Sequence, residues 1–236
     1  MVKDLFPNKI LSLSNKVFET LVVLLVLVIT LGLIYALFIS PPDYIQGNSV
    51  RIMYVHVPAS FLALACFGFI GIISAAALIF KIKIFPFIAK SLAPVGFIFS
   101  VISIVTGSLW GKPTWGVWWA WDARLTSMMV LVFFYIIYIG VWKFVDSFEK
   151  ASKISSIIAI IGSLNLPIIK YSVDWWNTLH QTSSITLTSS PTIHYTMLIP
   201  LIVMLVGMII YTLIIFLMKY KTEIIKFKIA VKKRKK

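Results

Sequence analysis

Cysteine is almost absent from this chain of 236 residues, and its scarcity excludes several kinds of redox chemistry. The single Cys66 lies inside an apolar run, where a small buried hydrophobic residue is expected. With one cysteine there is no CxxC redox pair, no cysteine zinc site and no CxxCH haem-attachment motif. The sequence also lacks GxxxxGK(S/T), the P-loop needed to hydrolyse a nucleotide. The chain is therefore neither a thiol–disulfide carrier nor a c-type cytochrome, and it does not power transport by itself.

Acidic residues are also scarce, with 8 Asp and Glu against 22 Lys and Arg, which gives a formal net charge of +14. Hydrophobic residues make up 60% of the chain and fall in long blocks, without the period of an amphipathic helix or strand. Blocks of this length predict an all-α, polytopic membrane protein. We expect one membrane domain over residues 1–236. Its six transmembrane helices are predicted at about 20–39, 57–80, 91–109, 125–142, 154–169 and 195–218, followed by a basic tail at 219–236.

The basic residues predict the orientation of these helices. Eighteen of the 22 lie before the first run, after the last, or in the two loops between runs two and three and runs four and five. The remaining four, in the other loops, are Arg51, Lys112, Arg124 and Lys170. The positive-inside rule then places both termini in the cytoplasm. The basic tail is interpreted as an anchor for lipid head groups, and the distribution does not favour nucleic acid as a partner.

A tryptophan-rich stretch connects the third and fourth predicted helices. Five tryptophans fall within twelve positions and are followed by an aspartate: Trp110, Trp115, Trp118, Trp119, Trp121 and Asp122. Lys112-Pro113 is expected to break the incoming helix. If residues 115–121 are helical, the tryptophans at 115, 118 and 119 share one face. The stretch is either an aromatic belt at the membrane interface or a platform for a large, flat aromatic ligand, and spacing leaves both open.

Two of the three histidines flank this stretch on the same predicted outer face. His56 lies at the start of the second helix, and His180 lies in the loop between helices five and six. Trp176 is the i, i+4 neighbour of His180 if residues 176–180 are helical. His194 lacks such neighbours and is interpreted as an ordinary interface residue. Two imidazoles make a poor zinc site. They can supply both axial ligands of a haem, whose other four ligands come from the porphyrin.

Charged residues near the outer face include Arg51, Lys112 and Arg124. They either contact lipid head groups or Asp122, or hold haem propionates, because arginine is suited to carboxylates. The interiors of the six predicted helices carry no charge. Ion-coupled transporters usually place charged residues there, so these helices are interpreted as a scaffold.

The segment WGKPTWGVWWAWDARLTS at 110–127, with Arg51–Pro58 and Trp176–Gln181, resembles the tryptophan-rich (WWD) haem-handling family. The resemblance covers the whole chain in length and in six-helix topology. It implies that His56 and His180 are the axial ligands of a haem b carried as cargo, and that the five tryptophans with Asp122 form the surface presenting it. It further implies that haem is held at the outer, periplasmic face of the bacterial inner membrane, or of an organellar inner membrane.

The same resemblance implies a role in cytochrome c biogenesis. The expected recipient of the haem is the haem chaperone CcmE, and the other expected partners are the small subunit CcmD and the ABC subunits CcmA and CcmB. A binding and presentation protein is thus expected, not an enzyme. Two alternatives remain, a haem lyase that attaches haem directly to apocytochrome c and a small-solute permease whose tryptophans form only a belt. Larger members of the family, the cytochrome c synthases, have more helices and histidines than 236 residues hold.

Overall fold

The computed structural model describes residues 14–182, 184–186 and 190–233. This part of the chain consists of helices and connecting loops and contains no β-strand. Six of its helical segments are long and apolar enough to cross a membrane, which confirms the predicted all-α class. Some basic residues used in predicting the orientation lie outside the described residues, namely Lys3, Lys9 and residues 234–236. Positions 183 and 187–189 of the last long loop are also outside them.

The helices follow the predicted order but mostly extend beyond the predicted bounds. The α-helices are α2 (Ser14–Ile34), α3 (Met53–Phe80), α4 (Phe85–Trp115), α5 (Ala123–Phe144), α6 (Phe148–Ser163), α7 (Asn165–Trp175) and α8 (Tyr195–Lys233). A π-helical turn, η1 (Tyr35–Ile39), continues α2, and a 3-10 turn, η2 (Asn48–Ile52), leads into α3. The fifth predicted helix is divided at Leu164 into α6 and α7, near the interrupting Asn165 and Pro167.

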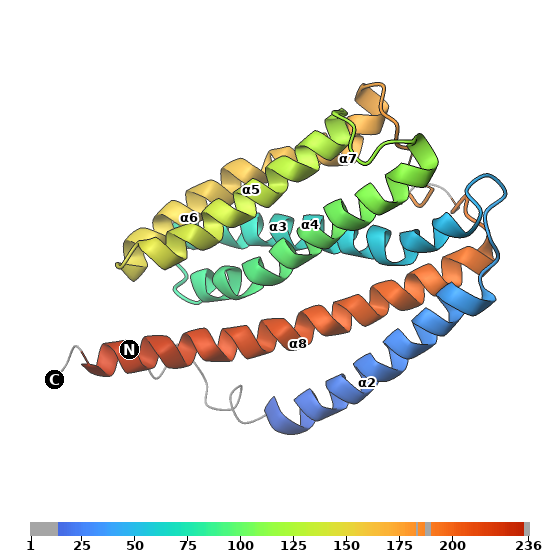
Figure 1. Ribbon diagram of the computed structural model, residues 1–236. Coiled ribbons are helices and arrows are strands. Elements are labelled where there is room, and N and C mark those ends of the chain that lie inside the picture. The colour runs from blue at the N-terminus through green and yellow to red at the C-terminus, as the bar shows by residue number, and fades with distance from the viewer. Residues whose placement is uncertain (1–13, 183, 187–189, 234–236) are drawn as a thin grey trace.

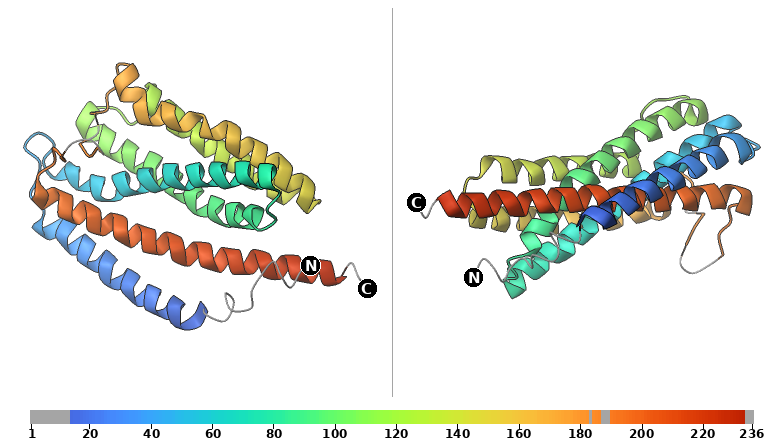
Figure 2. Two further views of the ribbon diagram at one scale, coloured as in Figure 1. Left: turned by 180° about the vertical axis from the view of Figure 1, so that it is seen from behind. Right: turned by 90° about the horizontal axis from the view of Figure 1, so that it is seen from below.

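The bundle has two unequal parts (Figures 1 and 2). Helices α3 to α7 form one group, and α8 lies between this group and the peripheral α2. The main core is built where α3, α4 and α5 meet and contains Ala63, Phe67, Ala93, Leu131 and Tyr135. Alanines on facing helices allow close backbone approach, as expected where packing and not hydrophobicity drives helix association in a membrane.

Two predicted boundaries are wrong for identifiable reasons. Helix α4 continues through Lys112-Pro113 to Trp115, because the proline removes only the one hydrogen bond that its own N–H would donate. The Gly116 N–H closes the end of the helix by donating to the carbonyl of Lys112 at 3.1 Å, and the Thr114 hydroxyl donates to the carbonyl of Trp110 at 2.7 Å. The second predicted helix begins earlier than residue 57, so His56 lies inside α3 and not before it.

The predicted basic tail is also helical as far as Lys233, as the last part of α8. Its apolar side chains explain this extension. Tyr220 and Ile224 are buried against Phe87 of α4, and Phe148 and Phe227 pack around the same cluster. A lysine-rich segment with apolar residues at helical spacing therefore remains attached to the bundle instead of separating from it.

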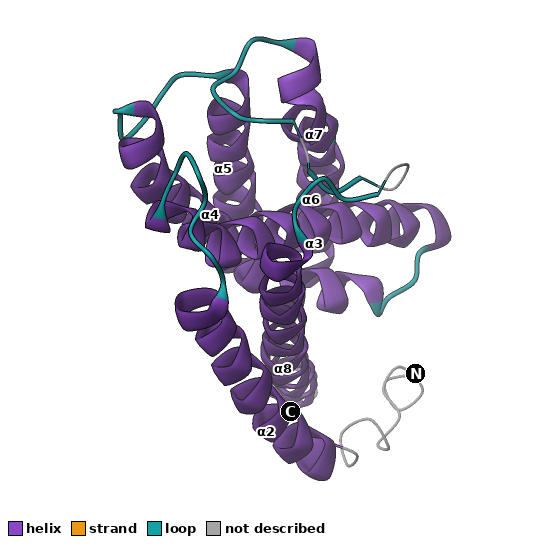
Figure 3. Cartoon of the chain, turned by 90° about the vertical axis from the view of Figure 1, so that its right-hand side faces the viewer, coloured by secondary structure: helices purple, strands orange, loops and turns teal. Residues whose placement is uncertain are grey.

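The two ends of the bundle differ in chemistry. The loops at 40–47, 116–122 and 176–194 gather at one end, on the right of Figure 1 and facing the viewer in Figure 3. The loops at 81–84 and 145–147 and the end of α8 lie at the other end. The tryptophan loop and the loop that contains His180 are therefore neighbours, although about 60 residues of chain separate them.

Candidate haem site at the tryptophan-bearing end

The tryptophan loop is not a helix, contrary to the interpretation that placed three tryptophans on one face. Gly116 ends α4 with a backbone φ of +78°, a left-handed conformation that glycine adopts without a steric penalty. Residues 116–122 are irregular, and the Ser108 hydroxyl fixes their path by donating to the carbonyl of Trp118 at 2.7 Å. Helix α5 then begins at Asp122, whose carboxylate accepts the backbone N–H of Leu125 at 2.7 Å as an N-cap.

The tryptophans of this loop present a large exposed aromatic surface. Trp118 is 56% exposed and Trp121 is 76% exposed. Trp119 lies between them and contacts Trp121 edge to face, with ring centroids 5.7 Å apart. Its indole N–H is buried and has no hydrogen-bond partner among the described residues. A buried donor without an acceptor is costly, so this N–H is available to an acceptor group on a ligand.

His56 is held between α3 and α4. Its Nδ1 lies 3.1 Å from the hydroxyl oxygen of Thr106, and the indole of Trp110 meets its ring edge to face at 5.7 Å. The Thr106 hydroxyl donates its own proton to the carbonyl of Ile102 at 2.6 Å. It therefore acts as an acceptor toward His56, which places the imidazole proton on Nδ1 and leaves Nε2 free to ligate a metal.

Gly107, one residue further along α4, lies close to this ring. A Cβ atom at position 107 would lie 3.0 Å from the Cε1 atom of His56, so the ring would have to shift by a few tenths of an ångström to make room for it. The absence of a side chain there lets the imidazole lie directly against the backbone of α4.

His180 is held in a similar way, although it lies in a loop. Its Nδ1 is 3.1 Å from the Oδ2 atom of Asp122, and Trp115 contacts its ring edge to face with centroids 4.7 Å apart. Helix α7 ends at Trp175, so the expected helical pairing of Trp176 with His180 is wrong, and Trp115 takes that place. Because a carboxylate only accepts, the imidazole proton again lies on Nδ1 and Nε2 is free.

The two histidines thus share one arrangement: an oxygen acceptor on Nδ1, a tryptophan at the ring edge and the lone pair on Nε2. They also lie within electrostatic reach of each other and of Arg124. Acceptors of this kind fix the orientation of imidazole ligands and raise their basicity in metal sites. Within the described residues no three His, Cys, Asp or Glu side chains are grouped to hold a bare metal ion. A group that supplies its own equatorial ligands fits two imidazoles.

Electrostatics keep His180 neutral. Burial lowers the pKa of His180 below its ordinary value of 6.5, and the positive charge of Arg124 lowers it further, whereas Asp122 opposes both. Only the neutral imidazole has a lone pair for a metal. Arg124 lies on the first turn of α5 and interacts electrostatically with Asp122 and Asp174. It forms no ion pair with a described residue.

The other candidate basic residues have structural partners. The guanidinium of Arg51 donates to the carbonyl of Leu37 and, at 3.2 Å, to that of Ser40, so it closes the end of η1. The ammonium of Lys112 donates to the carbonyl of Gly116 at 2.9 Å. The imidazole of His194, the third histidine, interacts with its neighbours Tyr195 and Thr196, and it is not joined to the paired arrangement.

Two residues of this site have no signal in the sequence. Thr106 is an ordinary helical threonine until the fold places it beside His56. Gln46, in the first loop, accepts the indole N–H of Trp110 at 2.8 Å and so fixes the tryptophan that contacts His56. Thr106 precedes Trp110 by four residues, and this helical spacing is the one hint that both face the same neighbour.

Comparison with known proteins identifies the family of this chain. The family model described as heme exporter protein C (CcmC) matches residues 3–235. The chain belongs to the heme exporter protein C family. It is 37% identical over 220 residues to heme exporter protein C of Bradyrhizobium diazoefficiens, which covers 93% of this chain and 83% of that protein.

Two further relatives extend the comparison. Heme exporter protein C of Escherichia coli K12 is 42% identical over 178 residues, covering 75% of this chain and 73% of the relative. A cytochrome c biosynthesis ccmC-like mitochondrial protein of Marchantia polymorpha is 41% identical over 192 residues, covering 81% of each chain. The family therefore has similar members in bacteria and in a mitochondrial setting, and this chain is a multi-pass membrane protein of that family.

Proposed function

We propose that this protein holds haem b as cargo at the tryptophan-bearing end of its bundle and delivers it for the maturation of c-type cytochromes. The axial ligands are the Nε2 atoms of His56 and His180. The observation that carries the proposal is the paired imidazole arrangement, in which each Nδ1 is occupied by an oxygen acceptor and each ring lies against a tryptophan. The names of its relatives support haem as the cargo.

Other residues of the site have distinct roles in this proposal. Arg124 holds a haem propionate, because its guanidinium lies within reach of both histidines and forms no ion pair with a described residue. Arg51 is not assigned this role, since its Nη1 and Nη2 atoms donate to the backbone carbonyls that end η1. The exposed Trp118 and Trp121 form the surface on which haem is presented. The buried indole N–H of Trp119 is available to a propionate oxygen.

We infer that this end faces the periplasm across the bacterial inner membrane, because the other end carries most of the lysines. In an organelle the equivalent is the outer side of its inner membrane, consistent with the mitochondrial relative. The recipient in this proposal is the haem chaperone CcmE. The partners in this proposal are CcmD and the ABC subunits CcmA and CcmB. CcmA and CcmB supply energy from nucleotide hydrolysis, because this chain has no P-loop of its own.

The absorption spectrum of the purified protein, made in haem-replete cells, tests the proposal. Wild type is expected to show a Soret band, and His56→Ala and His180→Ala are each expected to weaken or shift it. His194→Ala is the matched control. It removes a histidine at the same end of the bundle, and this histidine has no part in the paired arrangement. A haem-free wild type would refute the proposal. Covalent attachment of haem to apocytochrome c by this protein alone would favour a lyase instead.

A further inference from the structure

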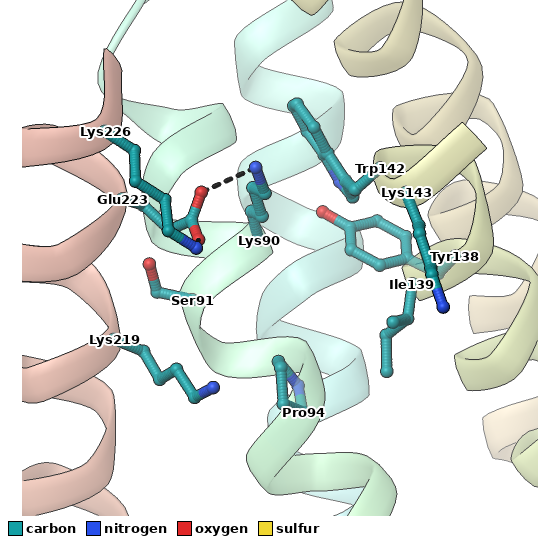
Figure 4. Close-up of a pocket in the computed structure, with 10 residues that line it drawn as sticks. All are labelled: Lys90, Ser91, Pro94, Tyr138, Ile139, Trp142, Lys143, Lys219, Glu223 and Lys226. Carbon is teal, nitrogen blue, oxygen red and sulfur yellow. Dashed lines mark hydrogen bonds and ion pairs between the residues drawn. The ribbon is translucent and has the colours of Figure 1, made fainter. Parts of the chain in front are cut away.

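The end of the bundle opposite the tryptophans carries a basic cavity between α4, α5 and α8 (Figure 4). Its volume is about 250 Å³. One water needs roughly 10–15 Å³ on this measure, so the cavity has room for a tetrahedral anion with part of its hydration shell. Four lysines and one glutamate are among its lining residues: Lys90, Lys143, Lys219, Lys226 and Glu223.

The charges around this cavity do not balance. The carboxylate of Glu223 pairs with Lys90 at 2.6 Å and with Lys226 at 3.5 Å. Lys219 extends from α8 toward the cavity and has no ion pair with a described residue, whereas Lys143 directs its amine away from Glu223 (Figure 4). Even without Lys143, three ammonium groups surround one carboxylate. The cavity therefore attracts an anion, because clustered like charges are stabilised by a counter-charge.

Aromatic residues supply the wall of the cavity. The ammonium of Lys90 lies 4.9 Å above the ring of Trp142. The indole N–H of Trp142 is directed at the hydroxyl of Tyr138, so the two aromatic side chains hold each other in place. An oxyanion with several acceptor oxygens can pair with more than one of the ammonium groups at once. Phosphate is the common anion with this property, and lysine binds it as a point charge.

The position of the cavity favours a phosphate attached to a lipid. The cavity lies where the apolar part of α8 gives way to lysine, at the level expected for head groups. Phe144 and Met218 directly adjoin two of its lysines in sequence, and they are 78% and 50% exposed. Exposed apolar side chains beside a basic cavity provide a surface for acyl chains where the cavity accepts the head group.

We propose that this cavity binds the phosphate of an anionic phospholipid such as phosphatidylglycerol, in the leaflet opposite the haem-bearing end. The bound head group links α8 to α4 and α5 and holds the helical extension of α8 against the bundle. This site is separate from the two histidines, and binding there does not depend on whether the protein carries haem.

Native mass spectrometry of the full-length protein in detergent tests the site, with phosphatidylglycerol and phosphatidylcholine offered in equal amounts. Wild type is expected to retain phosphatidylglycerol preferentially. The double variant Lys219→Gln/Lys226→Gln is expected to lose roughly tenfold or more of that preference. Both lysines are exposed, so the variant is expected to fold, and an unchanged haem spectrum would verify this. Lys83→Gln/Lys150→Gln removes equal charge from the same end outside the cavity and is expected to keep the preference.

Inorganic phosphate distinguishes the two sources of the anion. If phosphate neither displaces phosphatidylglycerol nor raises the melting temperature of wild type, the lipid assignment stands. If phosphate does both, and only in proteins with Lys219 and Lys226 intact, the site belongs to a soluble phosphate compound and the lipid assignment is overturned. An equal lipid preference in wild type and both double variants would overturn the site altogether.

Discussion

His56 and His180 reach the same chemical state from opposite structural starting points. His56 lies inside a long helix, with its ring against the backbone of α4 and its Nδ1 on a neutral hydroxyl. His180 lies in a loop and depends on the carboxylate of Asp122, which also accepts the backbone N–H of Leu179 at 3.4 Å. Packing therefore positions the first histidine, and a hydrogen bond to a carboxylate positions the second.

This difference has a consequence for the role of each residue. Asp122 fixes three features at once, since it caps α5, orients His180 and places a negative charge behind that imidazole. Thr106 performs only the orienting part for His56, without a charge. A carboxylate makes an imidazole ligand more basic than a hydroxyl does. If both histidines ligate haem as proposed, the bond from His180 is expected to be the stronger of the two.

The largest effect that distinguishes the two sides is expected at Asp122. Asp122→Asn keeps one acceptor oxygen, which can still cap α5, but places an NH2 group where Oδ2 faces His180 and removes the charge. It should lower haem affinity by about tenfold and raise the haem reduction potential. Asp122→Ala loses both functions, so affinity should fall by roughly 10- to 100-fold and stability by about 1 kcal/mol. Haem titration, potentiometry and thermal unfolding measure these changes. An unchanged potential in Asp122→Asn would contradict the unequal axial bonds.

A smaller effect is expected from Thr106→Val, which keeps the shape of the side chain but removes the acceptor for His56. Haem affinity should fall by about tenfold, at the lower end of the range for residues that support a metal ligand. Thr106→Ser is the control and should restore wild-type binding, because the hydroxyl is retained. If valine and serine behave alike, packing alone holds His56 and the hydrogen bond contributes nothing.

Gln46→Leu is expected to have a still weaker effect, because it acts on His56 only through Trp110. Loss of one hydrogen bond to the indole costs about 1 kcal/mol, which corresponds to roughly fivefold in affinity. The Soret maximum should keep its position, since neither axial ligand is altered. A shifted maximum would show that Trp110 affects the iron itself and not only the orientation of His56.

The smallest effect concerns pH in the haem-free protein. Because burial and the charge of Arg124 lower the pKa of His180 in the folded state, this residue should titrate below pH 6.5. The unfolded chain then binds more protons than the folded one as the pH falls below 6.5, so stability should decline with acidification. NMR titration of labelled histidine measures this, with the signal identified by its loss in His180→Gln. A midpoint at or above 6.5 would contradict the effect of burial and Arg124.

Much of this fold could be predicted because long apolar blocks have few alternatives. Each block must form a helix to satisfy its backbone in a membrane, so the number and order of the spans follow from composition. Local boundaries were harder to predict. The proline of Lys112-Pro113 indicates a break, yet Gly116 is where α4 ends, and the tail predicted after 218 continues as helix because Tyr220 and Ile224 have partners in α4.

The candidate ligands, too, could be named from the sequence, but not the residues that hold them. His56 and His180 stand out beside tryptophans at the same predicted face. Thr106 and Gln46 do not, because a threonine in a helix and a glutamine in a loop have no distinctive pattern. Their relation to the site depends on contacts between residues 50 and 64 positions apart.

The sequence by itself determined the class of this protein, its six spans, the concentration of lysine at one end, and the tryptophans and histidines at the other. These features follow from composition along the chain, since the membrane constrains each segment separately. Tertiary structure decided which tryptophan meets which histidine, which nitrogen carries each proton, and which arginine donates to backbone carbonyls. Those outcomes depend on how α4, α5 and the two loops meet, and only a folded chain brings such distant residues into contact.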